Sequence, residues 1–346
     1  MDGGPHSSSP LAVNPAGWPT EVLGVFERSI TTEYASLTRT ASPITVPTTP
    51  YIGVDGRTLD VSTGLTYPAK AERARRNPRV CLLFADPVGS GFTDPPVVLV
   101  QGLATVRDAD LQANTDRYVR ASMEKLPSAV KGQPKAALRR LSWYYARIWI
   151  EVTPLHIRWW PSRAMGEAPR TWDAAQGTAA PLSDPAPGGK QPGAWLTPPS
   201  SWRDVANHAL DRLALHDLTV VGANGFPLCI PVSHTALADD GFRLDIGPGA
   251  PELVQGPACL TLHTHPAAFT NQENRTIVGS VQAHPGGGGT IRFWAERALA
   301  DWSLAGGRAR AAFGMLSKGR RLSARLKAEA DRRFQPVPSV RFPDET

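Results

Sequence analysis

The sequence is poor in cysteine: it has three in 346 residues, and no two of them form a Cys-x-x-Cys pair. Cys81, Cys229 and Cys259 each lie in a separate apolar, strand-like run. Isolated cysteines in such runs are typical of small buried side chains in a reducing compartment. Their scarcity argues against a disulfide framework and against a cysteine-ligated metal.

Long apolar runs are also absent. No stretch of about 18 consecutive apolar residues occurs, which is roughly the length that a membrane-spanning helix needs. The first residues lack the basic-then-apolar order of a secretory signal peptide. We therefore expect a soluble, cytoplasmic protein with no membrane partner.

The body of the chain lacks a strong charge imbalance. The net charge is +6, and the basic tail supplies this excess. The tail is predicted as a helix over residues 308–333, with Phe313, Leu316, Leu322 and Leu326 among the cations. We expect these apolar side chains to pack on the protein itself, and we expect no nucleic-acid partner. Binding of nucleic acid or of a membrane surface is the alternative that such a basic helix leaves open.

Length and composition predict two domains, because 346 residues are many for a single core. Glycine, serine and proline dominate the first residues, and a second Pro/Gly-rich stretch without apolar periodicity divides the chain near its middle. The predicted parts are a disordered N-terminus (1–19), a first domain (20–160), a linker or long surface excursion (161–200), a second domain (201–304) and a basic helical tail (305–346).

Short β-branched or alternating runs dominate both halves, with helices inserted between them. This pattern predicts an α+β fold in which β-structure predominates. Strands are predicted at 44–46, 58–62, 80–85, 97–106, 147–153, 218–221, 228–232, 242–246, 259–264, 276–282 and 290–296. Helices are predicted at 21–34, 69–76, 108–125, 134–145 and 202–215.

Three motifs occur in both halves in the same order. They are the pattern G-x-x-L-D-[VI]-x-x-G, a proline-containing turn before an apolar strand, and a strand containing Val and Gly. They lie at 56–64, 77–84 and 100–102 in the first half and at 241–249, 256–262 and 278–279 in the second. A repeat of about 100 residues indicates a duplicated domain, because solenoid repeats are shorter.

Hydroxyls and cations gather where a predicted strand leads into the helix at 69–76. Ser62, Thr63 and Thr66 stand at the strand end, and Lys70 lies in the first helical turn. Free backbone N–H groups of a first helical turn, hydroxyl donors and an ammonium group are the elements of a phosphate site. A basic helix whose charges are merely solvated is the alternative.

This segment resembles the pyridoxamine 5'-phosphate oxidase-like, FMN-binding split-barrel family. In that family a strand ending in Thr or Ser is followed by a Lys-bearing helix, an Asn-Pro-Arg-Val turn, an apolar strand and then the pattern V-x-G-x-A-x-V. Residues 77–80 here read Asn-Pro-Arg-Val, and residues 100–106 read Val-Gln-Gly-Leu-Ala-Thr-Val. The resemblance covers residues 21–160 well and 202–304 more weakly. It implies two tandem split β-barrels and a flavin cofactor.

The resemblance also implies cofactor contacts. Ser62, Thr63 and Lys70 would lie at the phosphate or ribityl chain, and Gln101 would lie near the ring or the ribityl chain. The strand over residues 39–46 would lie against the edge of the isoalloxazine ring. Its predicted contacts are Arg39, Thr40, Ser42 and Thr45.

The cations of that first strand depart from the family pattern. Oxidases of the vitamin B6 type usually supply an Arg and a Lys there, whereas this strand has Arg39 and no Lys. Vitamin B6 chemistry is therefore disfavoured, and the sequence looks more like the branch that includes deazaflavin-dependent reductases. We predict an oxidoreductase that uses FMN, or the deazaflavin coenzyme F-420, on an unidentified small molecule. No catalytic side chain is predicted, because the cofactor itself carries the hydride chemistry.

The second copy lacks the basic helix. Residues 250–255 stand in its place, and Glu252 would repel a phosphate. We predict that the second copy binds no flavin in the manner of the first. Members of the family commonly dimerise and bind the cofactor at the interface. The resemblance thus implies a pseudo-dimer within one chain and leaves a further homodimer open.

His263 and His265 form the one histidine pair of interest in the second half. Alternate residues of a strand point to the same face, as two imidazole ligands would. Polar residues on a solvated face, or hydrogen-bonded core histidines, are the simpler interpretation, and no metal site is predicted. The rival functions are haem or metal chemistry at these two histidines and a non-catalytic flavin-binding or scaffold module.

Overall fold

The computed structural model describes residues 14–127, 134–193, 196–269, 272–282, 288–300 and 308–343. Its first half contains α1 (Thr20–Arg28), β1 (Thr32–Leu37), β2 (Pro43–Thr48), β3 (Tyr51–Ile52), β4 (Leu59–Gly64), α2 (Ala69–Arg76), β5 (Arg79–Phe84), β6 (Val97–Arg107), α3 (Leu111–Lys125), α5 (Lys135–Arg139), α6 (Ser142–Tyr145), β7 (Arg147–Trp160) and β8 (Arg170–Asp173). The second half contains α7 (Arg203–Arg212), β9 (Leu215–Val221), β10 (Pro227–Pro231), β11 (His234–Ala238), β12 (Gly241–Ile246), β13 (Gly256–Thr264), β14 (Glu273–Val281) and β15 (Gly289–Ala298), and α8 (Arg308–Asp331) follows.

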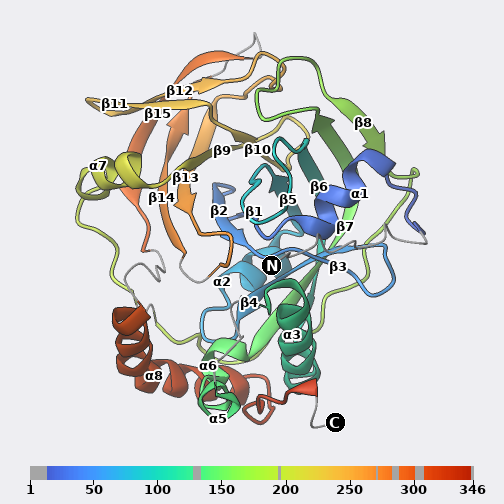
Figure 1. The fold of residues 1–346 in the computed structure, drawn as a ribbon, viewed down its shortest axis with the longest axis vertical. Coiled ribbons are helices and arrows are strands. Elements are labelled where there is room, and N and C mark those ends of the chain that lie inside the picture. The colour runs from blue at the N-terminus through green and yellow to red at the C-terminus, as the bar shows by residue number, and fades with distance from the viewer. Residues whose placement is uncertain are drawn as a thin grey trace, which may run out of the picture.

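The described strands form two antiparallel sheets with the same strand order (Figure 1). The first sheet runs β2-β1-β5-β6-β7-β4-β3, with β8 paired to β7, and the second runs β10-β9-β13-β14-β15-β12-β11. Each strand of the second sheet therefore has the same neighbours as its counterpart in the first, with β9 to β15 corresponding to β1 to β7. Two curled half-barrel sheets with one topology fit a tandem duplication, and the predicted β-dominated α+β fold is confirmed.

The first helix is shorter than the sequence predicted. The helix expected over 21–34 ends at Arg28, and residues 32–34 belong to β1. Ser29 already has an extended backbone, with φ −62° and ψ 127°, and the β-branched residues 30–32 favour a strand. The prediction was wrong here because apolar residues continue at helical spacing beyond Ser29, where the backbone changes from helical to extended. The strands β1, β3, β8 and β11 were not predicted.

A β-bulge stands at the same point of both sheets. The register of β6 against β7 shifts between Gln101 and Gly102, and that of β14 against β15 shifts between Val278 and Gly279. A Cβ on either glycine would collide with a carbonyl oxygen of the neighbouring strand. Glycine is required where a bulge brings two backbones this close. The shared motif at 100–102 and 278–279 is therefore the sequence signature of the bulge.

Strand β5 is buried on both faces, which explains its unbroken apolar sequence. Val80, Leu82 and Phe84 lie in the core of the first half, whereas Cys81 and Leu83 belong to the cluster that forms the core of the second half. Successive side chains of a strand point to opposite faces, so each half packs against one face of β5.

Strand β13 has the same two-sided role. Leu260 and Leu262 lie in the core of the second half. The alternate residues Cys259, Thr261 and His263 contact Ile44, Thr45 and Glu33 of the first half, respectively. The two halves therefore meet through β1, β2 and β5 on one side and β9, β10 and β13 on the other.

Segments predicted to lie outside the two domains pack on the first half. Trp18, in the stretch predicted as disordered, is buried and meets Phe26 edge-on at 5.5 Å between ring centroids; residues 1–13 of that stretch lie outside the described residues. Within the stretch predicted as a linker, residues 170–173 form β8. Further along it, Asp184 accepts a hydrogen bond from the backbone N–H of Asp108 at 2.7 Å. The predicted domain boundaries stay a prediction.

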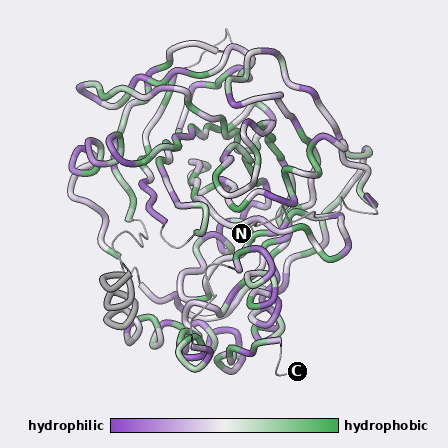
Figure 2. The backbone as a smooth tube through the Cα atoms, viewed as in Figure 1, coloured by the Kyte–Doolittle hydropathy of each residue, from purple (hydrophilic) through white to green (hydrophobic). Residues whose placement is uncertain are grey.

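The C-terminal helix α8 lies beside α5 and α6 at one end of the molecule (Figure 1). Leu322 and Leu326 are buried in the core of the first half, as predicted for the apolar residues of the tail. The side chains of Phe313 and Leu316 lie outside the described part of the chain. Hydrophilic residues are frequent on α3 and α7 (Figure 2). Among the described helices, none combines the length and apolar character needed to span a membrane.

Candidate functional site

The predicted phosphate site lies where β4 leads into α2. Ser62, Thr63 and Thr66 are buried, and Lys70 is half-buried in the first turn of the helix. The Thr63 hydroxyl donates to the backbone carbonyl of Tyr67 at 3.1 Å, which holds the turn in place. The hydroxyl of Thr66 is buried and has no hydrogen-bond partner. The four predicted residues thus lie along one strand–helix connection, and one of them, Thr66, has an unpartnered buried hydroxyl.

Two arginines that the sequence analysis did not single out lie beside Lys70. Arg147 begins β7 opposite Gly64 of β4, and its guanidinium donates to the Tyr118 hydroxyl at 2.9 Å. Arg73 follows Lys70 on α2 and donates to the Ser36 hydroxyl at 2.9 Å. Among the described residues, no ion pair joins Lys70, Arg73 or Arg147 to a carboxylate. We name Thr66 and these three cations the cradle.

The electrostatics of the cradle favour an anion. Burial, followed by the charges of Arg147 and Arg73, lowers the pKa of Lys70 from 10.5 to about 7. Burial likewise lowers the pKa of Arg73. Against the effect of burial, by contrast, the tyrosines around Arg147 raise the pKa of its guanidinium. A bound phosphate would offset the repulsion that Arg147 and Arg73 exert on Lys70.

Helix α8 reaches the cradle from the far end of the sequence. Arg325 donates through Nε to the backbone carbonyl of Thr66 at 2.9 Å. Burial lowers the pKa of this guanidinium as well. The basic tail therefore contributes to the surroundings of the cradle. No sequence motif pointed to this contact, because it depends on how the tail packs.

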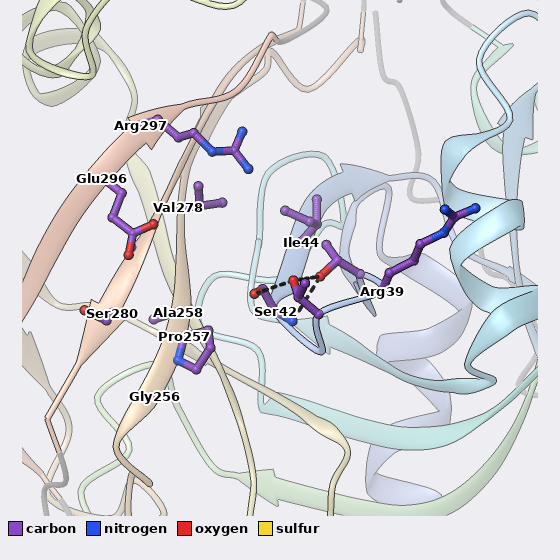
Figure 3. A pocket seen from close by; sticks show the side chains of 13 residues that line it. Arg39, Ser42, Ile44, Gly256, Pro257, Ala258, Val278, Ser280, Glu296 and Arg297 are labelled. Atoms are coloured by element: carbon purple, nitrogen blue, oxygen red, sulfur yellow. Dashed lines mark hydrogen bonds between the residues drawn. The ribbon is translucent and has the colours of Figure 1, made fainter.

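A cavity of about 510 Å³ opens between the halves, close to the β1–β2 turn (Figure 3). Its lining residues are Thr38, Arg39, Thr40, Ser42 and Ile44 of the first half and Gly256, Pro257, Ala258, Val278, Gly279, Ser280, Glu296 and Arg297 of the second. The side chain of Arg297 extends toward Ile44, whereas Arg39 points away from Arg297. Three of the predicted contact residues, Arg39, Thr40 and Ser42, thus line a space that both halves enclose.

Arg73 links the cradle to this cavity. Its partner Ser36 pairs across the β1–β2 ladder with Ile44, a residue of the cavity wall. Cys259 of the second half packs in one cluster with Ile44 and Val278, which both line the cavity. The cradle and the cavity are therefore neighbouring parts of one region.

Two predicted contact residues lie elsewhere in the interface. The hydroxyl of Thr45 shares a hydrogen bond of 2.6 Å with that of Thr219. Gln101 donates to the carbonyl of Pro227 at 2.9 Å and accepts from the amide of Asn224 at 2.9 Å. The geometry therefore divides the predicted set, and Thr45 and Gln101 bind the second half in this structure.

The duplication predicts a second cavity, related to the first by exchange of the two halves. The turn between β9 and β10 occupies that position. Asn224 bonds Gln101 of β6, and the Phe226 ring packs against His156 of β7 and beneath the Arg79 guanidinium. Between β12 and β13 the described chain has no helix corresponding to α2. The absence of a second flavin stays a prediction, and these contacts agree with it.

His263 and His265 have different partners. His263 is buried with its Nε2 2.9 Å from Glu33 Oε1 and 3.5 Å from Asp217 Oδ2. His265 Nε2 lies 2.6 Å from Asp86 Oδ2, and its Nδ1 lies 3.0 Å from the carbonyl of its neighbour Pro266. No sequence pattern pointed to Glu33, Asp217 or Asp86, because these residues are distant from the two histidines in the sequence. Burial and the charge of Asp217 raise the pKa of Glu33 to about 7.

Comparison with known proteins gives matches among solved structures alone: no model of a protein family matches the chain, and no curated protein matches it. A candidate pyridoxamine 5'-phosphate oxidase from Listeria innocua is 23% identical with a TM-score of 0.28, and the match covers 41% of this chain and 96% of that one. An F420 reductase is 18% identical with a TM-score of 0.29, covering 38% and 92%. A pyridoxamine 5'-phosphate oxidase-related, FMN-binding protein from Nostoc punctiforme is 13% identical with a TM-score of 0.28, covering 38% and 73%.

Proposed function

We propose that the chain is an oxidoreductase that binds FMN, or the deazaflavin coenzyme F-420, between its two halves. The observation that carries this proposal is the cradle, in which the buried hydroxyl of Thr66 has no hydrogen-bond partner and the charges of Arg73 and Arg147 act on Lys70, with no carboxylate among the described partners of these three cations. Cations that are buried or half-buried without a counter-charge are costly, and an anionic ligand offsets that cost.

The residues of the cradle fit a phosphate group. Lys70 and Arg73 would supply charge, and Thr66 would donate through its hydroxyl. The backbone N–H groups at the start of α2 add donors, since the first turn of a helix leaves them unpaired. These groups hold and orient the phosphate end of the ligand.

The neighbouring cavity suits the ring system. Its volume of about 510 Å³ lies within the range of small-molecule sites. A flavin or deazaflavin supplies two-electron hydride chemistry when bound. The walls from both halves exclude water from one side of the ring, and Glu296 and Arg297 place one charge of each sign at the second-half wall. We therefore expect a small polar substrate to approach along that wall.

The proposal is tested with tag-free protein. The ligand released by heat is identified from its absorbance spectrum and mass, and FMN and F-420 are then titrated by fluorescence. We expect binding of about one cofactor per chain and at least a tenfold weaker affinity in Lys70→Met. Ser42→Trp, which fills the cavity, should weaken binding of the ring while leaving the cradle unchanged. Lys190→Met serves as the control, because Lys190 is exposed in the segment between the halves.

Two results would overturn the proposal. One is that the wild type binds neither cofactor, and the other is that Lys70→Met binds as tightly as the wild type. Binding without turnover, measured as no change in cofactor absorbance with reductants and candidate acceptors, would favour the non-catalytic binding module. The haem or metal alternative that uses both His263 and His265 has less support, because both ring nitrogens of His265 already have partners.

A further inference from the structure

Three ionisable side chains meet in the contact between the halves. Glu33 extends from β1, Asp217 from β9 and His263 from β13, and each is at most 1% exposed. Glu33 stands opposite Pro47 in the β1–β2 ladder, and Asp217 stands opposite Pro231 in the β9–β10 ladder. The two carboxylates therefore occupy corresponding positions in the two copies, and the imidazole lies between them.

Two of the distances among these groups match those of ligands around one ion. Nε2 of His263 lies 2.9 Å from Glu33 Oε1 and 3.5 Å from Asp217 Oδ2, and one ligand atom from each residue falls within 4.8 Å of the others. Ligand atoms about 2.1 Å from a metal are about 3.0 Å apart in octahedral geometry and about 3.4 Å apart in tetrahedral geometry.

The polar atoms of this cluster are poorly satisfied without an ion. Neither oxygen of Glu33 and neither ring nitrogen of His263 makes a hydrogen bond of acceptable geometry, and Asp217 Oδ1 makes none either. A single N–H at Nε2 can point at one carboxylate only, so it cannot satisfy both Glu33 and Asp217. Buried polar atoms of this kind call for an explanation, and a bound ion is one of the ordinary ones.

The surroundings suit a metal with mixed oxygen and nitrogen ligands. Arg163 lies 3.8 Å from Asp217 Oδ1, the oxygen that does not face His263, and its Nη1 donates to the Ala85 carbonyl at 2.8 Å. A cation behind a ligating carboxylate orients it and balances the second negative charge. His265 takes no part, because its Nε2 is bound to Asp86 and Thr31 at 2.6 Å.

We propose that Glu33, Asp217 and His263 bind one divalent transition-metal ion that fastens the two halves together. Two carboxylates and one imidazole suit Zn²⁺ or Mn²⁺, whereas Mg²⁺ and Ca²⁺ prefer oxygen ligands alone. Because the ligands come from both copies, the ion would act on the stability of the interface. This site is separate from the cradle and stands independently of any flavin.

The test begins with metal content. Tag-free full-length protein is analysed by inductively coupled plasma mass spectrometry, stripped with a chelator, and titrated with Zn²⁺ and Co²⁺. We expect one equivalent of metal, and we expect the visible spectrum of the Co²⁺ form to show oxygen and nitrogen ligation without thiolate bands. Metal binding to the native state alone should raise the melting temperature of the stripped protein.

Matched variants identify the ligands. His263→Asn and Glu33→Gln each replace a ligand by a neutral amide, and both should weaken Zn²⁺ binding at least 100-fold and abolish the metal-dependent rise in melting temperature. His265→Asn is the control from the same segment and should bind Zn²⁺ as the wild type does. The Co²⁺ spectrum is recorded on each variant that folds, so that loss of binding is not confused with loss of structure. Stripped wild type that takes up no metal, or His263→Asn that binds as tightly as wild type, would overturn the proposal and leave a proton-sharing cluster.

Discussion

The guanidinium of Arg333 lies 2.9 Å from the carboxylate of Asp108, although 225 residues separate them in the chain. Both side chains are only 3% exposed. Arg333 also bonds Glu329 at 2.7 Å and lies 3.4 Å from Glu72 of α2. One guanidinium thus ties the end of α8 to the helix that carries the cradle.

Arg333→Met should therefore be strongly destabilising. It removes one of the two arginine partners of each of the buried carboxylates Asp108 and Glu329, and breaking a buried pair costs up to about 3 to 5 kcal/mol. The control is Lys327→Met, whose ion pair with Asp331 is exposed and worth less than about 0.5 kcal/mol. Urea denaturation followed by circular dichroism measures both. Equal stabilities for the two variants would contradict the importance of this contact.

The two bulge glycines should be equally intolerant of a side chain. Gly102→Ala and Gly279→Ala each place a Cβ against a carbonyl oxygen of the neighbouring strand, and we expect a loss of at least about 2 kcal/mol in the free energy of unfolding. Gly166→Ala is the matched control, because a Cβ there meets no atom within 4 Å. Thermal unfolding of the three variants checks this. A tolerant Gly279 would show that the second bulge is looser than the structure indicates.

Affinity for a phosphate-bearing cofactor should fall as the pH rises above 7. The pKa of free Lys70 is lowered to about 7, and the phosphate binds its protonated form. Binding therefore requires proton uptake above that pH, and the dissociation constant should rise up to about tenfold per pH unit from pH 7 to 8.5. Lys70→Met lacks the titrating group and should give a flat profile. Fluorescence titrations at several pH values distinguish the two, and a flat wild-type profile would argue against Lys70 as a phosphate contact.

The same lowered pKa has a consequence for the protein without a ligand. The unfolded chain holds the Lys70 proton more tightly than the folded chain does, so the unfavourable contribution grows as the pH falls from 10.5 to 7. Stability of the cofactor-free protein should rise with pH over that window, and Lys70→Met should reduce the slope. Chemical denaturation at pH 7, 8 and 9 measures it. An unchanged slope in the variant would mean that Lys70 titrates normally in the fold.

The three cysteines should be unreactive in the native protein. Cys81, Cys229 and Cys259 are free and buried, and burial raises the pKa of Cys81 and of Cys229, so little thiolate forms. We expect no fast reaction with Ellman's reagent under native conditions and three thiols per chain after denaturation. A thiol that reacts at once would show that the contact between the halves opens.

Local patterns in the sequence predicted most of the strands and helices. Alternating and apolar runs located the inner strands, and the glycine of the bulge made the repeat visible at 100–102 and 278–279. The strand β1 was missed because its residues continue the apolar pattern of the helix before it. The short strands β3, β8 and β11 carry too few residues for a clear period.

The residues of the candidate site were predictable only where they lie close together in the sequence. Ser62, Thr63, Thr66 and Lys70 are close in sequence, so the strand–helix connection sufficed to group them. Arg147 and Arg325 arrive from a later strand and from the tail, and no nearby motif marks them. The partners of His263 were likewise beyond sequence reasoning, because Glu33 and Asp217 are brought to it by the packing of two separate sheets.

Fusion of the two copies frees their contact from a constraint that binds a homodimer. In a two-fold homodimer each residue must suit its own image across the axis, so a change appears twice or not at all. Here His263 of β13 faces the first half, whereas the corresponding strand of the first half, β5, offers Cys81 and Leu83. An exact two-fold axis repeats every residue, so it does not permit an imidazole between two carboxylates to occur only once. Covalent linkage thus lets the two sides of one interface carry different side chains, so that each copy can change without a matching change in the other.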